Sequence, residues 1–462
     1  METRDAEFGA VGEMVLEKYL GDGAFDFLNL IALDLNGSLR SVTLPKSYAT
    51  KELFKKGIGF DASNYGYAKV TESDMIIVPD EETAFIEKRG GFRILHALGD
   101  VRTASGDLFD QYPRNIVKKT RGFLREKNIA DDMRALVELE FYIFNSVEYG
   151  CDVTGSFYSV GSAEGLGHGF DTNPRFAPHQ GYHRLPPDDR YMDFRNRTVS
   201  LMEEIGIPVK YHHHEVGASQ LEIELNFMNI QKAADNVCLA KWIIRSVADK
   251  MGLKVTFMPK PLYKMAGSGM HVHQFLEKSG ASIFIGDELY GLSRQGLSYI
   301  AGLLEHSLTG SLLAFTNPST NSYRRLISGY EAPVSASFAK ASRNAAVRIP
   351  GYLGKKEVRM EYRTGDASAN VHYMLAAMTL AGCDGILRGR DPVALKFGDA
   401  SSGGAGKFPL NLHAVMDGLE KDHQYLEPVF PKELFDLWIS AKRAEADYVY
   451  NAPAPQEYEL YF

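Results

Sequence analysis

Acidic and imidazole side chains alternate with apolar residues in several short segments of this sequence. Residues 137–141 and 221–225 each carry two glutamates two positions apart, and residues 270–273 carry two histidines in the same pattern. Residues 359–363 repeat the alternation with two arginines around one glutamate. Residues two apart in a β-strand lie on one face, so each segment would present one polar face and one apolar face as a strand.

The chemistry of these polar faces favours a metal site over a surface in water. A half-exposed antiparallel sheet would also explain any single segment, but its polar face would be expected to carry Lys, Thr and Ser as well. Four strands of carboxylates and imidazoles would crowd like charges that cations relieve. Glutamate and histidine suit Mg²⁺ or Mn²⁺, and two such ions suit phosphoryl transfer. Zinc is less suited because no cysteine joins the set.

A nearby segment, residues 211–215, reads Tyr-His-His-His-Glu. Strand alternation would place only part of this run on the metal face, and a lone histidine is more often a hydrogen-bonded core group than a ligand. Among these residues we therefore take Glu215 alone as a candidate ligand.

Arginines form a second cluster within 40 residues of one another. Taken singly, each is best explained as a surface salt bridge. Arginine nevertheless suits bidentate binding of carboxylate and phosphate, and these arginines interleave with the acidic segments. The pattern predicts a polyanion held between metal ions and guanidinium groups, which phosphoryl transfer requires. The cluster comprises Arg324, Arg325, Arg343, Arg348, Arg359 and Arg363.

The elements that would position these residues fall into two parts. A chain of 462 residues predicts two or three domains. Apolar runs around Asn36-Gly37 predict a β-hairpin over residues 27–44, and Pro113 is typical of a helix start. We place a domain boundary between residues 111 and 112. Residues 231–251 have apolar side chains at helical spacing and predict a helix whose stripe faces the core.

Composition and charge exclude several classes of partner. The net charge is −8 without a block of like charge, so we expect neither nucleic-acid binding nor a polybasic membrane surface. No apolar run approaches the roughly 20 residues needed to span a bilayer, and the acidic start lacks the features of a signal peptide. Three cysteines far apart in the sequence indicate a reducing compartment. The expected location is the cytoplasm.

Taken together and in order, the motifs of this chain resemble the glutamine synthetase family, and the resemblance spans roughly residues 25–460. Many short strings in family order make a chance match implausible. The strings are Phe60-Asp61-Ala62-Ser63, Glu72-Ser73-Asp74-Met75, residues 137–141, His213-His214-Glu215-Val216, residues 257–261 (Phe-Met-Pro-Lys-Pro), residues 267–273 (Gly-Ser-Gly-Met-His-Val-His), residues 317–323 (Asn-Pro-Ser-Thr-Asn-Ser-Tyr), residues 329–334 (Gly-Tyr-Glu-Ala-Pro-Val) and Arg348-Ile349-Pro350.

The resemblance implies an α+β fold with a small N-terminal β-grasp-like domain (residues 1–111) and a large catalytic domain (residues 112–462). The catalytic domain would contain an open antiparallel β-barrel flanked by helices. The resemblance also implies a homo-oligomer of hexameric rings, stacked as a dodecamer, with each active site between neighbouring subunits.

The same resemblance implies ATP and two or three Mg²⁺ or Mn²⁺ ions as cofactors. One metal would be held by Glu140, Glu215 and Glu222. The other would be held by Glu138, His271 and Glu361. The ATP side of the site would be formed by His273, Arg348 and Arg359.

Substrate and catalytic roles also follow from the resemblance. Arg325 and Arg363 would bind the carboxylates of glutamate, and Gly267 would lie against its backbone. Arg343 would meet the transferred phosphate. Glu331 would be the acid of a flap that covers the acyl phosphate and accepts a proton from ammonium. The ammonium pocket would be formed by Tyr182, by Asp61 from the neighbouring subunit, and by Ser63.

Five positions depart from the family pattern. Lys210 stands where the family has a glutamate, and Ala266 where it has an asparagine. Phe275 replaces a serine near the nucleotide, and Ser342-Arg343-Asn344 replaces Asn-Arg-Ser. These changes bear on the adenosine contacts and on glutamate selectivity, whereas the set of metal ligands is complete.

Glutamine synthesis is the leading functional hypothesis: ATP and glutamate give γ-glutamyl phosphate, which ammonia attacks. One alternative is a γ-glutamyl ligase that uses an alkylamine or polyamine in place of ammonia. The presence of Asp61 and Tyr182 favours ammonia, because a larger amine has little use for a tight cation pocket. A second alternative is a catalytically silent assembly protein, which would be expected to lose metal carboxylates.

Overall fold

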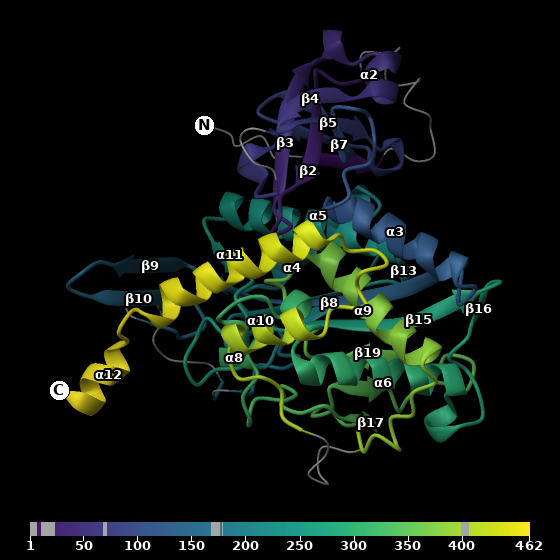
Figure 1. The fold of residues 1–462 in the computed structure, drawn as a ribbon. Coiled ribbons are helices and arrows are strands. Elements are labelled where there is room, and N and C mark those ends of the chain that lie inside the picture. The colour runs from purple at the N-terminus through teal and green to yellow at the C-terminus, as the bar shows by residue number, and fades with distance from the viewer. Residues whose placement is uncertain (1–6, 11–23, 68–71, 168–175, 178, 399–405) are drawn as a thin grey trace.

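A small β-rich N-terminal part stands on a larger body of mixed strands and helices (Figure 1). The computed structural model describes residues 7–10, 24–67, 72–167, 176–177, 179–398 and 406–462. The expected α+β class is confirmed. Residues 161–169 are rich in glycine, and residues 168–169 of this stretch lie outside the described part.

The N-terminal sheet has seven described strands in the order β1-β6-β7-β2-β3, with β5 pairing β7 and β4 pairing β5. The predicted hairpin is confirmed, because β2 and β3 pair antiparallel and Gly37 turns with φ 82°. The positive φ explains the glycine, since other residues rarely adopt it. The strands are β1 (Glu7–Ala10), β2 (Phe27–Leu33), β3 (Leu39–Pro45), β4 (Ile58–Asp61), β5 (Asp74–Pro79), β6 (Phe85–Arg89) and β7 (Phe92–Thr103), with helix α2 (Lys51–Lys56) between β3 and β4.

The larger body contains a ten-stranded sheet in the order β11-β12-β8-β15-β19-β18-β17, with β13 and β14 on β8 and β16 on β15. Strand β8 is central, and every pair is antiparallel except β17 with β18. We expected an open antiparallel barrel, and the sheet agrees with this except where β17 runs parallel to β18. The strands are β8 (Asp132–Phe144), β11 (Val209–His214), β12 (Gln220–Leu225), β13 (Met228–Asn229), β14 (Lys254–Thr256), β15 (Met270–Lys278), β16 (Ala281–Ser282), β17 (Phe338–Lys340), β18 (Val347–Ile349) and β19 (Met360–Tyr362).

Helices cover this sheet and bury its apolar face (Figure 1). The predicted helix over residues 231–251 is observed as α5, which begins after Asn229, whose side chain accepts a hydrogen bond from the Lys232 amide. Asparagine is a preferred residue at this capping position. The helices are α3 (Pro113–Glu126), α4 (Met192–Glu204), α5 (Ile230–Lys250), α6 (Arg294–Thr309), α7 (Leu313–Thr316), α8 (Ser322–Arg325), α9 (Val371–Leu387), α10 (Leu412–Lys421), α11 (Lys432–Tyr450) and α12 (Pro455–Tyr461).

A buried arginine at the start of α3 joins the two parts. Arg114 is fully buried, and its guanidinium bonds Asp80 at 2.6 Å, Asp100 at 2.5 Å and Asp235 at 3.0 Å. Asp80 and Asp100 belong to the N-terminal part, whereas Asp235 lies on α5. A buried guanidinium needs such partners, so this contact fixes the N-terminal sheet on the body.

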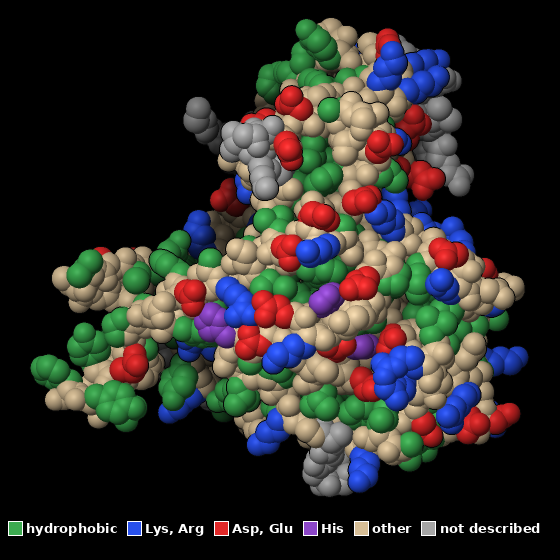
Figure 2. Space-filling view, viewed as in Figure 1, with side chains coloured by type: hydrophobic (Ala, Val, Ile, Leu, Met, Phe, Trp, Pro, Cys, Tyr) green, Lys and Arg blue, Asp and Glu red, His purple; other side chains and the backbone are tan. Residues whose placement is uncertain are grey.

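Two segments project from the body on one side. They are the hairpin of β9 (Ser146–Cys151) with β10 (Ser156–Gly161) and the C-terminal helix α12 (Figure 1). Apolar side chains lie at the tips of both projections (Figure 2). Among the helices of the described residues, none is both long and apolar enough to cross a membrane.

Candidate active site

The strand register gathers the alternating polar residues into rows across the central sheet. In the first row Glu222 of β12 pairs with Glu140 of β8. In the second row Glu138 of β8 lies between Glu224 of β12 and His271 of β15. Directly paired residues point to the same face of a sheet, so these side chains share one face, as the alternation predicted.

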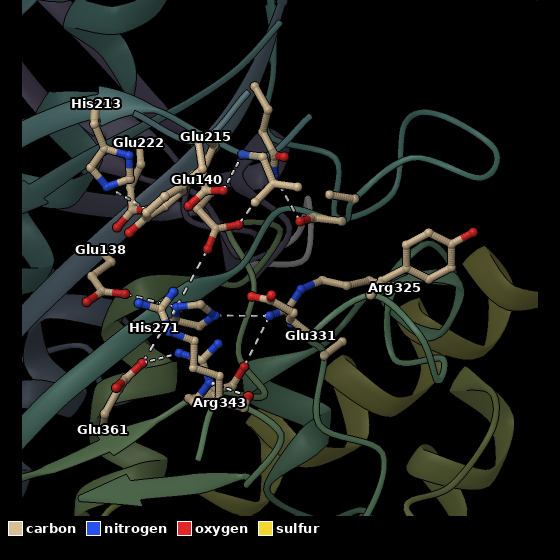
Figure 3. Close-up of a pocket in the computed structure, with 18 of the residues that line it drawn as sticks. Glu138, Glu140, His213, Glu215, Glu222, His271, Arg325, Glu331, Arg343 and Glu361 are labelled. Carbon is tan, nitrogen blue, oxygen red and sulfur yellow. Dashed lines mark hydrogen bonds and ion pairs between the residues drawn. The ribbon is translucent and has the colours of Figure 1, made fainter. Parts of the chain in front are cut away.

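A third row continues across β15, β19 and β18. His273 pairs with Glu361, and Glu361 pairs with Arg348. Figure 3 shows the labelled glutamates and histidines converging on a common space, with Arg325, Glu331 and Arg343 nearby. The rows line a cavity of about 460 Å³, a volume typical of a small-molecule site.

One group of potential metal ligands consists of Glu138, His271 and Glu361. One ligand atom from each lies within 4.8 Å of the others, so the structure brings this predicted triad together. The Nδ1 atom of His271 lies 2.9 Å from Glu138 and 3.9 Å from Glu361. Burial alone would raise the pKa of Glu138, yet its hydrogen bonds with His271 and His273 hold that pKa well below the ordinary value. Glu138 is therefore an anion available to a cation.

Glu361 is held as an anion by arginines. Its carboxylate bonds Arg348 at 2.6 Å and also bonds Arg363. Burial opposes ionisation, but the charges of Arg363 and His273 lower the pKa of Glu361 to about 2. The Glu361 carboxylate therefore lies among basic side chains, with Arg348, Arg363 and His273 around it.

A second group of ligands consists of His213, Glu215 and Glu222, again within 4.8 Å of one another. Glu215 and Glu222 were predicted, whereas the sequence analysis had set His213 aside. Glu140, the third predicted member, pairs with Glu222 across the strands but directs its Oε1 atom to His271 at 3.6 Å. Glu140 therefore lies between the two ligand groups.

The hydrogen bonds of His213 test whether a cation fits this second group. Its Nδ1 atom lies 3.1 Å from the His214 carbonyl and must donate to it, so Nε2 keeps a lone pair. That lone pair faces the carboxylate of Glu222 at 3.4 Å. Two acceptors facing each other need a proton or a cation between them.

The protonation of the second group supports the same conclusion. Burial lowers the pKa of His213 to about 4, so this imidazole is neutral. Burial and the charge of Glu140 raise the pKa of Glu215 to about 7. Burial and the neighbouring carboxylates raise the pKa of Glu222 well above its usual value. The site is short of positive charge, and divalent cations would supply it.

Arg325 and Gly267 form another wall of the cavity. Arg325 is buried, and its guanidinium donates to the carbonyls of Thr364 at 2.6 Å and Arg363 at 3.1 Å. A Cβ atom on Gly267 would come within 2.6 Å of Arg325 Cγ and 2.9 Å of the Pro259 carbonyl. The glycine therefore permits the close approach of the arginine to this backbone.

Three predicted residues lie at the mouth of the cavity, where side chains are more exposed. Arg343 lies over the ring of Tyr182 at 5.9 Å, and both line the cavity with Glu331. Glu331 has φ 57°, a left-handed conformation that is strained for a non-glycine residue. The neighbouring Tyr330 ring lies under Lys260, whose Nζ is 3.6 Å from the ring centroid. This cation–π contact anchors the side chain next to Glu331 on the cavity wall.

The residues predicted for the ATP side lie around Glu138 and Glu361. The Nε2–H group of His273 donates to the ionised Glu138 at 2.9 Å, and Arg359 Nε donates to the Nδ1 atom of His273 at 3.5 Å. Arg359 also lies over the ring of Phe227 at 5.3 Å. A guanidinium over an aromatic ring offers stacking surfaces to a planar base, a feature that the sequence analysis missed.

Asp61 and the nearby Ser63 are predicted site residues that lie in the N-terminal part, away from the cavity of their own chain. Asp61 ends strand β4 of the N-terminal sheet, is exposed, and is not among the residues that line the cavity. The Ser63 amide and hydroxyl donate to its carboxylate at 2.8 and 3.0 Å. The hydrogen bond from the Ser63 amide is the main cause of the lowered pKa of Asp61. The single chain therefore does not bring Asp61 to the metal ligands.

The close approach at Gly267 gives a testable prediction. We expect Gly267→Ala to displace Arg325 or the Pro259 backbone, because its Cβ would overlap both. Steady-state kinetics should show a higher KM for the carboxylate substrate that the sequence predicts for this wall, and thermal unfolding should show a folded protein. Gly122→Ala is the matched control, since a Cβ there meets nothing within 4 Å. An unchanged KM in Gly267→Ala would contradict the assignment of this wall.

The fold and the cavity define an α+β enzyme whose site is built for divalent cations and anionic substrates. Two family models match the chain: "Glutamine synthetase, beta-Grasp domain" over residues 24–103 and "Glutamine synthetase, catalytic domain" over residues 110–461. The chain belongs to the glutamine synthetase family, and the resemblance found in the sequence is confirmed.

Individual relatives agree with this assignment. A glutamine synthetase of Frankia alni is 38% identical over 96% of this chain and 98% of its own length. The solved structure of Plasmodium falciparum glutamine synthetase matches with a TM-score of 0.90 at 26% identity, over 98% of this chain and 100% of that chain. A structure of apo GmaS matches with a TM-score of 0.79 at 24% identity, over 96% of this chain and 98% of that chain, and shows the fold alone.

Proposed function

We propose that this protein joins ammonia to the γ-carboxylate of glutamate at the expense of ATP, giving glutamine, ADP and phosphate. The observation that carries the proposal is the convergence of two ligand groups and several arginines on one cavity, in a chain of this family. The residue roles below are part of the proposal.

The first step forms γ-glutamyl phosphate. Arg325 and Arg363, with Gly267, orient glutamate so that an oxygen of its γ-carboxylate attacks the γ-phosphorus of ATP and ADP leaves. Arg343, at the mouth, neutralises charge on the transferred phosphoryl group. His273, Arg348 and Arg359 hold the nucleotide on the opposite side.

Two or three Mg²⁺ or Mn²⁺ ions fit the donor set. Glu140, Glu215 and Glu222, with His213, would hold one ion, and Glu138, His271 and Glu361 would hold another. When bound, such ions neutralise phosphate charge and align the reacting oxygens.

The second step needs ammonia as a neutral nucleophile. Asp61 of a neighbouring subunit and Tyr182 would attract ammonium as a cation. Glu331 would take a proton from it, after which the nitrogen attacks the γ-carbonyl carbon. Phosphate then leaves and carries away the second proton that the nitrogen loses as the amide forms. The strained backbone of Glu331 supports a flap that changes conformation during the cycle.

An assembly of stacked hexameric rings would bring Asp61 to a neighbour's cavity. The projecting β9–β10 hairpin and α12 support contacts between copies, because Tyr149, Phe157, Tyr461 and Phe462 are more than half exposed. The mass of the native particle tests this assembly: a stable monomer would contradict it. Buried free thiols at Cys238 and Cys383 support a cytoplasmic location.

A panel of amines tests the nucleophile. Purified protein with glutamate, MgATP and ammonia should release phosphate and form glutamine, and ammonia should exceed methylamine and ethanolamine in kcat/KM. Steric discrimination against one methylene is limited to roughly 10- to 200-fold, so some amine activity is compatible with the proposal. An organic amine that outperforms ammonia at equal concentration would favour the γ-glutamyl amine ligase.

A further inference from the structure

An ion pair between a partly exposed lysine and a buried carboxylate lies beside the two ligand groups. Glu224 of β12 is 1% exposed, and its Oε1 accepts from Lys210 Nζ at 2.7 Å. Its Oε2 has no hydrogen bond among the described residues. Neither residue has been given a role above.

The strand geometry directs Lys210 into the cavity. The pairing of β11 with β12 shifts between Val209 and Tyr211, so Lys210 is the extra residue of a β-bulge. Neighbouring residues of a regular strand point to opposite faces, yet Lys210 and Tyr211 both line the cavity. Bulges beside active sites commonly redirect a side chain in this way.

Glu224 is an anchor for this ammonium group. A buried carboxylate without a counter-charge is costly, and Lys210 supplies that charge. Glu224, Glu138 and His273 lie within 4.8 Å of one another and resemble a third cation site. Lys210 supplies one positive charge to this cluster through its contact with Glu224.

The position of Lys210 indicates which substrate it meets. Glu215 lies five residues further along the chain, which corresponds to roughly 16 Å of extended strand. Arg325 lies 3.2 Å from His271, and the Gly267 carbonyl accepts from Gln220 at 2.9 Å. Lys210 instead bonds Glu224, whose ligand atom lies within 4.8 Å of those of Glu138 and His273. Because His273 belongs to the proposed nucleotide side, Lys210 lies on that side as well.

The residues beyond the bulge extend this end of the site. Val209 pairs with Leu225, and Phe227 follows two residues later. Phe227 contacts both Arg359 and Phe275 at 5.3 Å. These rings and the guanidinium form the stacking surface described above, so Lys210 lies between that surface and the metal ligands along the sheet.

We propose that Lys210, anchored by Glu224, binds the phosphate chain of the nucleoside triphosphate and helps to select nucleotides by their phosphates. The inference rests on the proposed use of ATP. A third of the Lys210 side chain remains exposed to the cavity, which leaves the ammonium donors beyond Glu224 available to phosphate oxygens.

The test compares the full-length protein with Lys210→Met, Lys210→Arg and the double variant Lys210→Met/Glu224→Gln by titration calorimetry. The ligands are the Mg²⁺ complex of the non-hydrolysable analogue AMP-PNP, and adenosine. The double variant removes both charges of the ion pair while keeping similar side-chain volumes, so it remains informative if Lys210→Met alone fails to fold because it leaves the buried Glu224 without a counter-charge. Thermal unfolding of each variant verifies the fold.

We expect both Met variants to raise the Kd for AMP-PNP roughly 10- to 100-fold, as loss of a charge-assisted hydrogen bond would. The Kd for adenosine should stay within about twofold, and Lys210→Arg should retain most of the AMP-PNP affinity because it keeps the charge. Unchanged AMP-PNP affinity in the folded double variant, or an equal loss for adenosine, would overturn the inference.

Two further outcomes separate this inference from its alternatives. Failure of the unmodified protein to bind AMP-PNP would contradict the proposed function itself. Loss of one bound Mn²⁺ per subunit in Glu224→Gln, counted by paramagnetic resonance, would assign the cluster to a metal and overturn the role of Lys210.

Discussion

Glu361→Gln is expected to lower kcat by more than roughly 100-fold, because even partners of metal ligands typically contribute 10- to 100-fold. Glu361 combines a ligand position with contacts to Arg348 and Arg363. Gln keeps the side-chain shape and one acceptor oxygen but loses the charge that a cation requires. Turnover with and without EDTA, and Mn²⁺ binding by calorimetry, measure the effect.

Glu277→Gln is the matched control, since Glu277 lies on β15 of the same sheet but does not line the cavity. It should retain activity and metal affinity. Thermal unfolding should show that Glu361→Gln is folded. Full turnover of the unmodified protein in excess EDTA would refute the two-metal site.

Asp61→Ala should raise the KM for ammonia roughly 10- to 100-fold while changing the KM for glutamate far less, because a charge-assisted contact to ammonium is lost. Asp61 is exposed on the N-terminal sheet, outside its own chain's cavity. We therefore also expect complementation at low ammonia concentration: weakly active Asp61→Ala and inactive Glu361→Gln subunits, dissociated and reassembled together, should regain part of the activity.

Glu52→Ala is a suitable control for Asp61→Ala, because Glu52 is an exposed carboxylate of the same part of the chain, paired with Lys56. It should leave both KM values unchanged. Verified mixed oligomers without recovered activity would indicate that each site is built within one subunit. Unaltered use of ammonia by Asp61→Ala would favour the organic-amine alternative.

Most of the central sheet and the face that bears its metal ligands could be predicted from the sequence, because both depend on local alternation of polar and apolar residues. Glu138, Glu222, His271 and Glu361 follow a period of two, and strand pairing then requires their side chains to meet on one face. The same rule could have identified His213, which lies two residues before Glu215. It was set aside because three consecutive histidines do not reveal which ones face inward.

Other features depend on irregular or distant contacts that periodicity does not encode. The β-bulge at Lys210 breaks the alternation, so its pairing with Glu224 could not be read from spacing. The parallel pairing of β17 with β18 depends on how the chain returns across the sheet. The stacking of Arg359 on Phe227 joins residues 132 positions apart in the sequence. The family resemblance indicated Arg359 as a site residue but not Phe227.

The register of β8 with its neighbours also makes the ligand site a test of correct folding. A slip of one residue between β8 and β15 would turn every acidic side chain of β8 from the cavity face to the apolar face. Such a misfolded sheet could retain its hydrogen bonds and compactness, yet it would bring no complete ligand group together. Divalent cations would then bind and stabilise only chains whose strands are in native register. Cations present during refolding would therefore shift the equilibrium from misaligned sheets towards the functional one.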